Sequence, residues 1–169
     1  YWSCARIGNL PPYYSHIDNR MKLNTMIVED EPLSRQYLAS LLNQFCEDVQ
    51  VVASVASERD ALNTIANNEL HLVFLDIELT TGTGFDVLKN LEEHSFYVVF
   101  TTALDHHATN LIELTGMDYL QKPIDIDELE AIIVTASAAR GKNKPQSGLP
   151  HLLRALDNGH VPVHVRLSD

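Results

Sequence analysis

Short apolar runs alternate along the chain with longer stretches in which apolar residues recur at helical spacing. The runs that predict buried β-strands are Leu23–Val28, Val49–Ala53, Leu72–Leu75, Tyr97–Thr101 and, more briefly, Asp118–Leu120. The Leu72–Leu75 run has no polar alternation, which is typical of a strand buried on both faces. A helical stretch follows each strand, and this strict β–α alternation predicts an α/β fold with a doubly wound parallel sheet.

The helical stretches carry their own start signals. Pro32 suits the first turn of a helix, where its missing N–H is no loss. Ser57 with Asp60 predicts an N-terminal cap, and Asp125 with Glu128 forms a capping-box pattern. The apolar residues of the first helix that share one helical face are Leu33, Tyr37, Leu38, Leu41, Leu42 and Phe45. The two helices in the middle of the chain are expected over residues 84–91 and 105–114.

The pattern divides the chain into four parts. Residues 1–21 lack any helical or strand period and are expected to be a disordered or non-native leader, an aromatic docking peptide being the alternative. Residues 22–139 form the main domain, and the polar stretch 140–148 reads as a linker. Residues 149–169 contain an aliphatic stripe (Leu149, Leu152, Leu153, Leu156) and then the strand-like alternation 161–167. We expect the stripe to be a packing helix, between domains or in a dimer, and the strand to begin an incomplete second domain.

Charge is distributed unevenly along the 169 residues, whose net charge is −11. Residues 22–139 carry 20 acidic and 5 basic side chains, a net charge of −15, so phosphates would repel this domain. Any contact with DNA must therefore come from the basic end or from residues beyond it. The two cysteines form no metal or disulfide pattern, and no membrane-spanning run or signal peptide is visible, so a cytoplasmic setting is expected.

The candidate chemistry centres on Asp76, which directly follows the buried strand and precedes a glycine-bearing turn. Open α/β sheets bind ligands at the carboxyl ends of their strands. In a flavodoxin-like order (2-1-3-4-5), the first and third strands are neighbours, and Glu29 and Asp30 would lie beside Asp76. Three clustered carboxylates repel one another unless a cation compensates, and all-oxygen ligation suits Mg²⁺.

Two further strand ends supply groups that suit a phosphoryl group. A metal-bound aspartate can accept a phosphoryl group, with catalysis mainly by positioning and charge neutralisation. Lys122, after the fifth strand, offers a point charge for phosphate oxygens. Thr102, at the end of the fourth strand, offers a hydroxyl to the same oxygens.

These motifs together resemble the receiver domain of two-component response regulators. The matching residues are Glu29-Asp30-Glu31-Pro32, Asp76 with Gly84 eight residues on, Thr102-Ala103, and Asp118-Tyr119-Leu120-Gln121-Lys122-Pro123. The resemblance covers residues 23–139 and implies a flavodoxin-like (βα)5 fold with the 2-1-3-4-5 strand order. It also implies that the protein is a phosphoacceptor rather than an enzyme with a separate substrate.

The resemblance assigns roles to individual residues. It makes Asp76 the phosphoacceptor. The Mg²⁺ ligands would be Asp30, Asp76, the backbone carbonyl of Glu78 and, largely through water, Glu29. Lys122 would contact the phosphoryl group. Thr102 and Tyr119 would form a switch pair, which changes the surface made by the helix after Thr102, the fifth strand and the last helix. Glu78 and Leu104 would tune the lifetime of the phosphoryl group. Thr80 departs from the family, which commonly has proline there, and is expected to loosen the loop after Asp76.

The tail is similar to the start of a LytTR-type DNA-binding domain. The leading hypothesis is therefore a LytTR-type transcription regulator that a sensor histidine kinase phosphorylates and that dimerises in response, with DNA bound only by a domain beyond Asp169. A stand-alone receiver that docks a protein partner is the second hypothesis. A third is a haloacid-dehalogenase-like phosphatase, because Asp76-Ile77-Glu78-Leu79-Thr80 loosely resembles its nucleophile motif, although no lid domain or late acid pair accompanies it.

Overall fold

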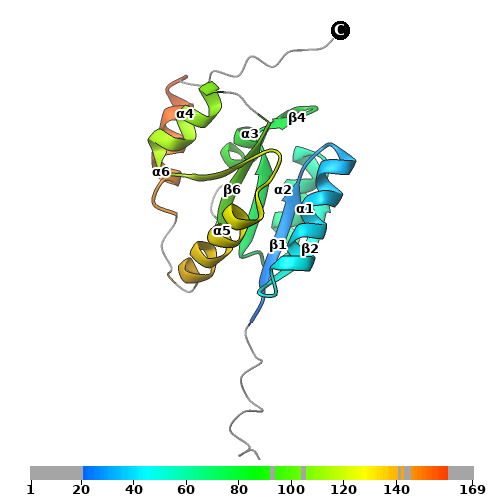
Figure 1. The fold of residues 1–169 in the computed structure, drawn as a ribbon. Coiled ribbons are helices and arrows are strands. Elements are labelled where there is room, and N and C mark those ends of the chain that lie inside the picture. Colours follow the sequence, from blue (N-terminus) through cyan, green and yellow to red (C-terminus); the bar gives the residue numbers. More distant parts are fainter. Residues whose placement is uncertain (1–20, 92–93, 104–105, 141, 143–145, 160–169) are drawn as a thin grey trace, which may run out of the picture.

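A parallel five-stranded sheet forms the centre of the computed structural model, which describes residues 21–91, 94–103, 106–140, 142 and 146–159 (Figure 1). The strands of this sheet are β1 (Leu23–Val28), β2 (Val49–Val55), β3 (Leu72–Asp76), β6 (Tyr97–Thr102) and β7 (Asp118–Gln121). A small antiparallel hairpin of β4 (Glu78–Leu79) and β5 (Gly82–Thr83) follows β3. The helices are α1 (Pro32–Phe45), α2 (Glu58–Asn67), α3 (Gly84–Lys89), α4 (His106–Thr115), α5 (Ile126–Ala139) and α6 (Leu149–Asp157).

The strands lie in the order β2-β1-β3-β6-β7, with every neighbouring pair parallel. Since β6 and β7 are the fourth and fifth strands of this sheet, the predicted flavodoxin-like order is confirmed. The register pairs Val28 with Leu75, Asp76 with Thr101, and Thr102 with Gln121. The carboxyl ends of β1, β3, β6 and β7 therefore meet at one edge of the sheet.

The structure shows the predicted cap residues Ser57 and Asp125 capping α2 and α5. The Ser57 hydroxyl accepts a hydrogen bond from the Asp60 amide (3.2 Å), and the Asp125 carboxylate accepts from the Asp127 and Glu128 amides. The start of α3 has a full capping box between Thr83 and Asp86, which the sequence reading missed. That helix also ends at Lys89, earlier than the predicted residue 91.

Two apolar clusters cover the two faces of the sheet. Helices α1 and α5 cover one face, and α2, α3, α4 and α6 cover the other. The predicted face of α1 is only partly correct: Leu38, Leu41 and Leu42 are buried, whereas Leu33 and Tyr37 are 73% and 51% exposed. Helical spacing predicts which apolar residues share one face of a helix, but the position of that helix at the edge of the sheet determines how many of them are buried.

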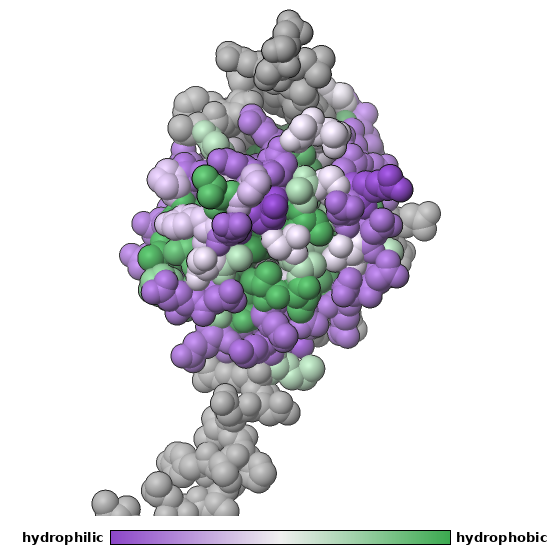
Figure 2. All heavy atoms as spheres, turned by 90° about the vertical axis from the view of Figure 1, so that its right-hand side faces the viewer, coloured by the Kyte–Doolittle hydropathy of each residue, from purple (hydrophilic) through white to green (hydrophobic). Residues whose placement is uncertain are grey.

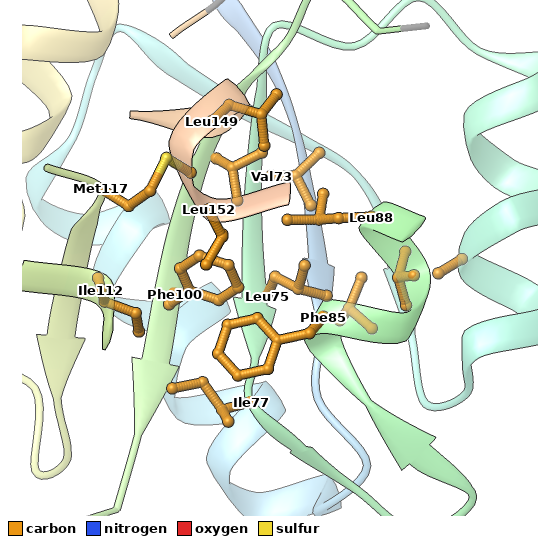
Figure 3. Packing of buried hydrophobic residues seen from close by; sticks show 14 of the residues in the cluster. Val73, Leu75, Ile77, Phe85, Leu88, Phe100, Ile112, Met117, Leu149 and Leu152 are labelled. Carbon is orange, nitrogen blue, oxygen red and sulfur yellow. The ribbon is translucent and has the colours of Figure 1, made fainter. Parts of the chain in front are cut away.

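Helix α6 lies beside α4 and packs on the face of the sheet that α2, α3 and α4 also cover (Figure 1). Figure 3 shows Leu149 and Leu152 reaching from α6 toward Val73 and Phe100 of the sheet. The predicted aliphatic helix is therefore present, but it packs on the chain's own core instead of offering its leucines to another domain or a second copy. Residues 1–20 of the predicted leader and the predicted strand over 161–167 lie outside the described residues. Among the described helices, none is long and apolar enough to cross a membrane.

Candidate functional site

Three carboxylates gather at the carboxyl edge of the sheet. Asp76 is the last residue of β3, and Glu29 and Asp30 directly follow β1, the strand beside it. Oxygen atoms of all three lie within 4.8 Å of one another. Asp76 and Glu29 are both 4% exposed. The predicted neighbourhood of these residues is therefore present, and it forms an all-oxygen donor set of the kind that Mg²⁺ prefers.

Lys122 brings a positive charge to these carboxylates. Its Nζ lies 3.0 Å from Asp76 Oδ2 and also donates a hydrogen bond to Glu29 Oε2. Lys122 follows β7, and its backbone N–H donates to the Thr102 carbonyl (2.7 Å), which holds it at the end of β6. One ammonium group is thus shared by two buried carboxylates.

The balance of charge at the site leaves the acids incompletely neutralised. Burial raises the pKa of Asp76 to about 7; Lys122 opposes this shift and Glu29 adds to it. Burial lowers the pKa of Lys122, but its hydrogen bond to Glu29 and its attraction to Asp76 outweigh that effect, and the pKa is raised. A bound cation would relieve the repulsion between Asp76 and Glu29, so these residues fit a divalent metal.

Backbone and hydroxyl donors that the sequence reading missed hold the three acids in place. The Glu78 amide donates to Asp76 Oδ1 (3.2 Å), and the Glu31 amide donates to Glu29 Oε1 (3.1 Å). The Thr80 hydroxyl donates to Asp30 Oδ2 (2.5 Å). The loop after β3 is therefore tied to the end of β1, whereas Thr80 in place of proline was expected to loosen this loop. The only sequence signal for this contact was that departure from the family pattern.

Gly84 has a steric reason to follow Asp76. Its amide donates to the Ile77 carbonyl (3.0 Å), so α3 begins against the end of β3. A Cβ atom on Gly84 would lie 2.3 Å from the Asp76 carbonyl oxygen and 2.9 Å from Leu75 Cγ. Any side chain at this position would clash with the backbone of Asp76, so the position requires glycine.

The two residues of the predicted switch pair lie on neighbouring strands. Thr102 ends β6, one position beyond the residue that pairs with Asp76, and is buried. Tyr119, on β7, is half-buried, and its hydroxyl donates to Glu113 Oε1 on α4 (2.6 Å). This hydrogen bond raises the pKa of Tyr119. The side chain of Glu78 is exposed, and Leu104 lies outside the described residues.

A groove opens beside the acidic site, between α1 and the segment after β7. The residues that line it are Glu29, Leu33, Ser34, Tyr37, Leu38, Thr101, Lys122, Pro123 and Ile124. Figure 2 shows the side of the molecule that carries α1 and the edge strand β2, where apolar areas lie among hydrophilic ones. Leu33 and Tyr37 therefore present apolar surface next to the carboxylates.

Comparison with known proteins identifies the family. The sequence model of the response regulator receiver domain family matches residues 25–134 of this chain. The chain is 33% identical over 127 residues to the sensory transduction protein LytT of Enterococcus faecalis, covering 74% of this chain and 52% of that protein. It is 32% identical over 148 residues to the transcriptional regulatory protein BtsR of Escherichia coli K12, covering 85% of this chain and 61% of that protein.

Solved structures agree with this assignment. The response regulatory domain of protein mrkE from Klebsiella pneumoniae matches with a TM-score of 0.60 and 28% identity, over 69% of this chain and 97% of that one. The receiver domain of a putative Luxo repressor protein from Vibrio parahaemolyticus matches with a TM-score of 0.58 and 29% identity, over 72% and 95%.

The chain belongs to the response regulator receiver family. It is thus a phosphoacceptor rather than a classical enzyme, and the acid triad Glu29, Asp30 and Asp76 is typical of a receiver Mg²⁺ site. Receiver domains of this family pair with histidine kinases. The relatives are of the LytT and BtsR kind, and the chain spans about half to three fifths of their length.

Proposed function

We propose that Asp76 accepts a phosphoryl group from a sensor histidine kinase in a Mg²⁺-dependent reaction. The observation that carries this proposal is the position of Asp76 at a buried strand end, bonded to Lys122 and clustered with Glu29 and Asp30. An oxygen of Asp76 attacks phosphorus while the bond from phosphorus to the donor imidazole nitrogen breaks. The Glu78 amide and Lys122 hold the carboxylate ready for this attack.

The metal would be held by Asp30, Asp76, the backbone carbonyl of Glu78 and, through water, Glu29. When bound, Mg²⁺ supplies charge neutralisation to the phosphoryl oxygens. The hydrogen bond from Thr80 orients the Asp30 carboxylate. Lys122 contacts the phosphoryl oxygens as a point charge, and Thr102 offers its hydroxyl to them. Glu78 and Leu104 are proposed to tune water access and hence the phosphoryl lifetime.

Phosphorylation is proposed to change the α4–β7–α5 surface. The Thr102 hydroxyl turns toward the new phosphoryl group, and the Tyr119 ring leaves its hydrogen bond with Glu113 and rotates inward. Exposed apolar residues on this surface, Leu114 (86% exposed) and Val134 (69%), support its use as a dimer contact. We expect the phosphorylated protein to form a homodimer through it.

The output is proposed to be transcriptional. BtsR, to which this chain is 32% identical over 148 residues, is a transcriptional regulatory protein. Because the receiver part has a net charge of −15, DNA would be bound by a further, LytTR-type domain and not by the receiver itself. Regulation would then act through dimerisation, which places two such domains on paired sites.

The kinase is proposed to dock in the groove beside α1. Leu33 and Tyr37 offer apolar contacts there, while Lys122 and Glu29 at the end of the groove border the acceptor. A helix of the kinase that carries the phosphohistidine would thereby be placed against Asp76.

The test is phosphorylation by a small donor. The chain is incubated with acetyl phosphate, with and without Mg²⁺, and intact mass is measured for the wild type and for Asp76→Asn. We expect a Mg²⁺-dependent phosphoryl adduct on the wild type and none on Asp76→Asn. An equal adduct on both proteins, or none on either, would refute Asp76 as the acceptor.

A further inference from the structure

The segment before α6 is anchored to the sheet by one side chain. Gln146 Oε1 accepts a hydrogen bond from the Val98 amide (2.9 Å), and Gln146 Nε2 donates to the Val98 carbonyl (3.0 Å). The pairing of β6 with β7 begins only at Val99. The Gln146 amide therefore takes the place of a neighbouring strand at Val98 and satisfies both of its backbone groups.

Two residues further on, backbone packs on backbone. Gly148 is buried, and a Cβ atom on it would lie 2.4 Å from the Thr115 carbonyl oxygen and 2.8 Å from the Gly116 carbonyl carbon. Thr115 ends α4, and Gly116 begins the turn into β7. The start of α6 is thus fitted to the present position of the α4–β7 corner, with no space for that corner to move toward it.

The apolar face of α6 completes the attachment. Leu149, Leu152 and Leu156 are 4%, 0% and 2% exposed. They belong to the same apolar cluster as Ile112 of α4 and Met117 of the α4–β7 turn, and Figure 3 shows Met117 beside Leu152. Helix α6 therefore packs on α4 as well as on the sheet.

The same corner carries the contacts of the proposed switch. Tyr119 on β7 is bonded to Glu113 on α4, and Lys122 after β7 is bonded to Thr102 and Asp76. A movement of α4 or β7 that follows phosphorylation would press on Gly148 and separate the leucines from Ile112 and Met117. Close-packed contacts of this kind have discrete arrangements and do not deform continuously.

We propose that residues 146–157 form a latch that phosphorylation releases. The docked α6 stabilises the arrangement of α4 in which Tyr119 points to Glu113, and phosphorylation of Asp76 favours the arrangement in which α6 leaves the sheet. The latch rests on the proposed function of Asp76. Because coupling between two sites is reciprocal, weakening the latch must also favour phosphorylation.

Hydrogen exchange measured by mass spectrometry tests the release. The 169-residue chain is compared with and without acetyl phosphate, both in Mg²⁺, and intact mass is recorded for the same samples. We expect amide exchange over 146–157 to become at least about tenfold faster in the phosphorylated chain. Peptides of β2, which lies at the opposite edge of the sheet from β7, should keep their exchange rate. An adduct with unchanged exchange over 146–157 overturns the latch and leaves Asp76 as acceptor, whereas the absence of an adduct overturns both.

The reverse direction is tested with variants of the anchor. Gln146→Ala removes both bonds to Val98, and Gly148→Ala pushes against the α4–β7 corner. Both should expose 146–157 without phosphate and raise the rate of adduct formation several-fold. Ser147→Ala, at the exposed position between them, is the matched control and should match the wild type. Equal rates of adduct formation in all three variants would also overturn the latch.

Discussion

Lys122 Nζ lies 3.0 Å from Asp76 Oδ2, although 46 residues separate the two in sequence. The same ammonium group is bonded to Glu29, so one lysine neutralises part of the charge of two buried acids. The lysine thus stabilises the free protein as well as preparing the site for a phosphoryl group.

Replacing this lysine should therefore damage both stability and chemistry. We expect Lys122→Met to lower the free energy of unfolding by about 1–3 kcal/mol, because two buried carboxylates then face each other without a cation. Adduct formation from acetyl phosphate should slow by about 10²-fold, as for loss of one stabilising group. Urea unfolding and intact mass measure the two effects. Lys89→Met, at an exposed position, is the control, and equal stability of the two variants would contradict the expectation.

The raised pKa of Asp76 predicts a pH dependence of stability in metal-free protein. Because burial raises this pKa from its ordinary value of 3.8 to about 7, the folded protein holds the proton more tightly than the unfolded chain between these values. The contribution of Asp76 to stability is therefore fully present below about pH 4 and is lost as the pH rises to about 7.

Comparison with Asp76→Asn isolates this effect from the other acids. In EDTA, the wild type should lose stability relative to Asp76→Asn between pH 4.5 and 7 and then run parallel to it, with the variant more stable at pH 8. Added Mg²⁺ should stabilise the wild type more at pH 8 than at pH 6. A constant difference between the two proteins across this range, measured by urea unfolding, would count against a buried, repelled Asp76.

The hydrogen bond between Thr80 and Asp30 predicts an effect on metal affinity. Thr80→Val removes the donor that orients Asp30, and one such exposed bond contributes on the order of 1 kcal/mol. We expect Mg²⁺ affinity, measured by calorimetric titration, to fall about three- to tenfold. Thr80→Ser retains the hydroxyl and should bind Mg²⁺ as the wild type does. A Thr80→Val protein with unchanged affinity would show that Asp30 needs no such orientation.

The close approach at Gly84 predicts a local steric effect. Gly84→Ala places a methyl group against the Asp76 carbonyl, and such overpacking costs about 1–3 kcal/mol. The shift of β3 should also slow phosphorylation of Asp76. Gly159→Ala adds a methyl group with no atom within 4 Å; the positive φ of Gly159 (+74°) makes this variant less stable too, but its phosphorylation should be unchanged. Thermal unfolding and intact mass, recorded for both variants, provide the comparison, and normal phosphorylation of Gly84→Ala would contradict it.

The groove beside α1 predicts that a substitution in it will slow phosphorylation by a histidine kinase but not by acetyl phosphate. Leu33→Ser alters a side chain that is 73% exposed, so stability and phosphorylation by acetyl phosphate should be unchanged. Transfer from a phosphorylated histidine kinase should slow about tenfold, since an apolar contact of the docked complex is lost. Leu114→Ser, at a position on α4 that is 86% exposed, is the matched control. If Leu33→Ser and Leu114→Ser slow the transfer equally, the kinase does not use this groove.

The sequence pattern predicted the strands and their parallel pairing, and the resemblance to receiver domains supplied the strand order that brings the acids together at one edge. Apolar runs such as Leu72–Leu75 predict buried strands because burial on both faces removes the polar alternation, and β–α alternation then requires parallel pairing. Asp76, Glu29 and Lys122 follow such runs directly, and parallel strands place their carboxyl ends at one edge. Capping residues such as Ser57 were equally readable, because the partner of a cap lies within three residues.

Only the tertiary structure determined what depends on distance through space. The bond from Thr80 to Asp30 spans 50 residues, and the raised pKa of Asp76 depends on how deeply the folded chain buries it. The stripe of Leu149, Leu152 and Leu156 predicts a helix that must pack, because helical periodicity identifies an apolar face. Periodicity contains no information about the surface that covers this face, and the space between α3 and α4 that α6 occupies exists only once the sheet and its helices have assembled.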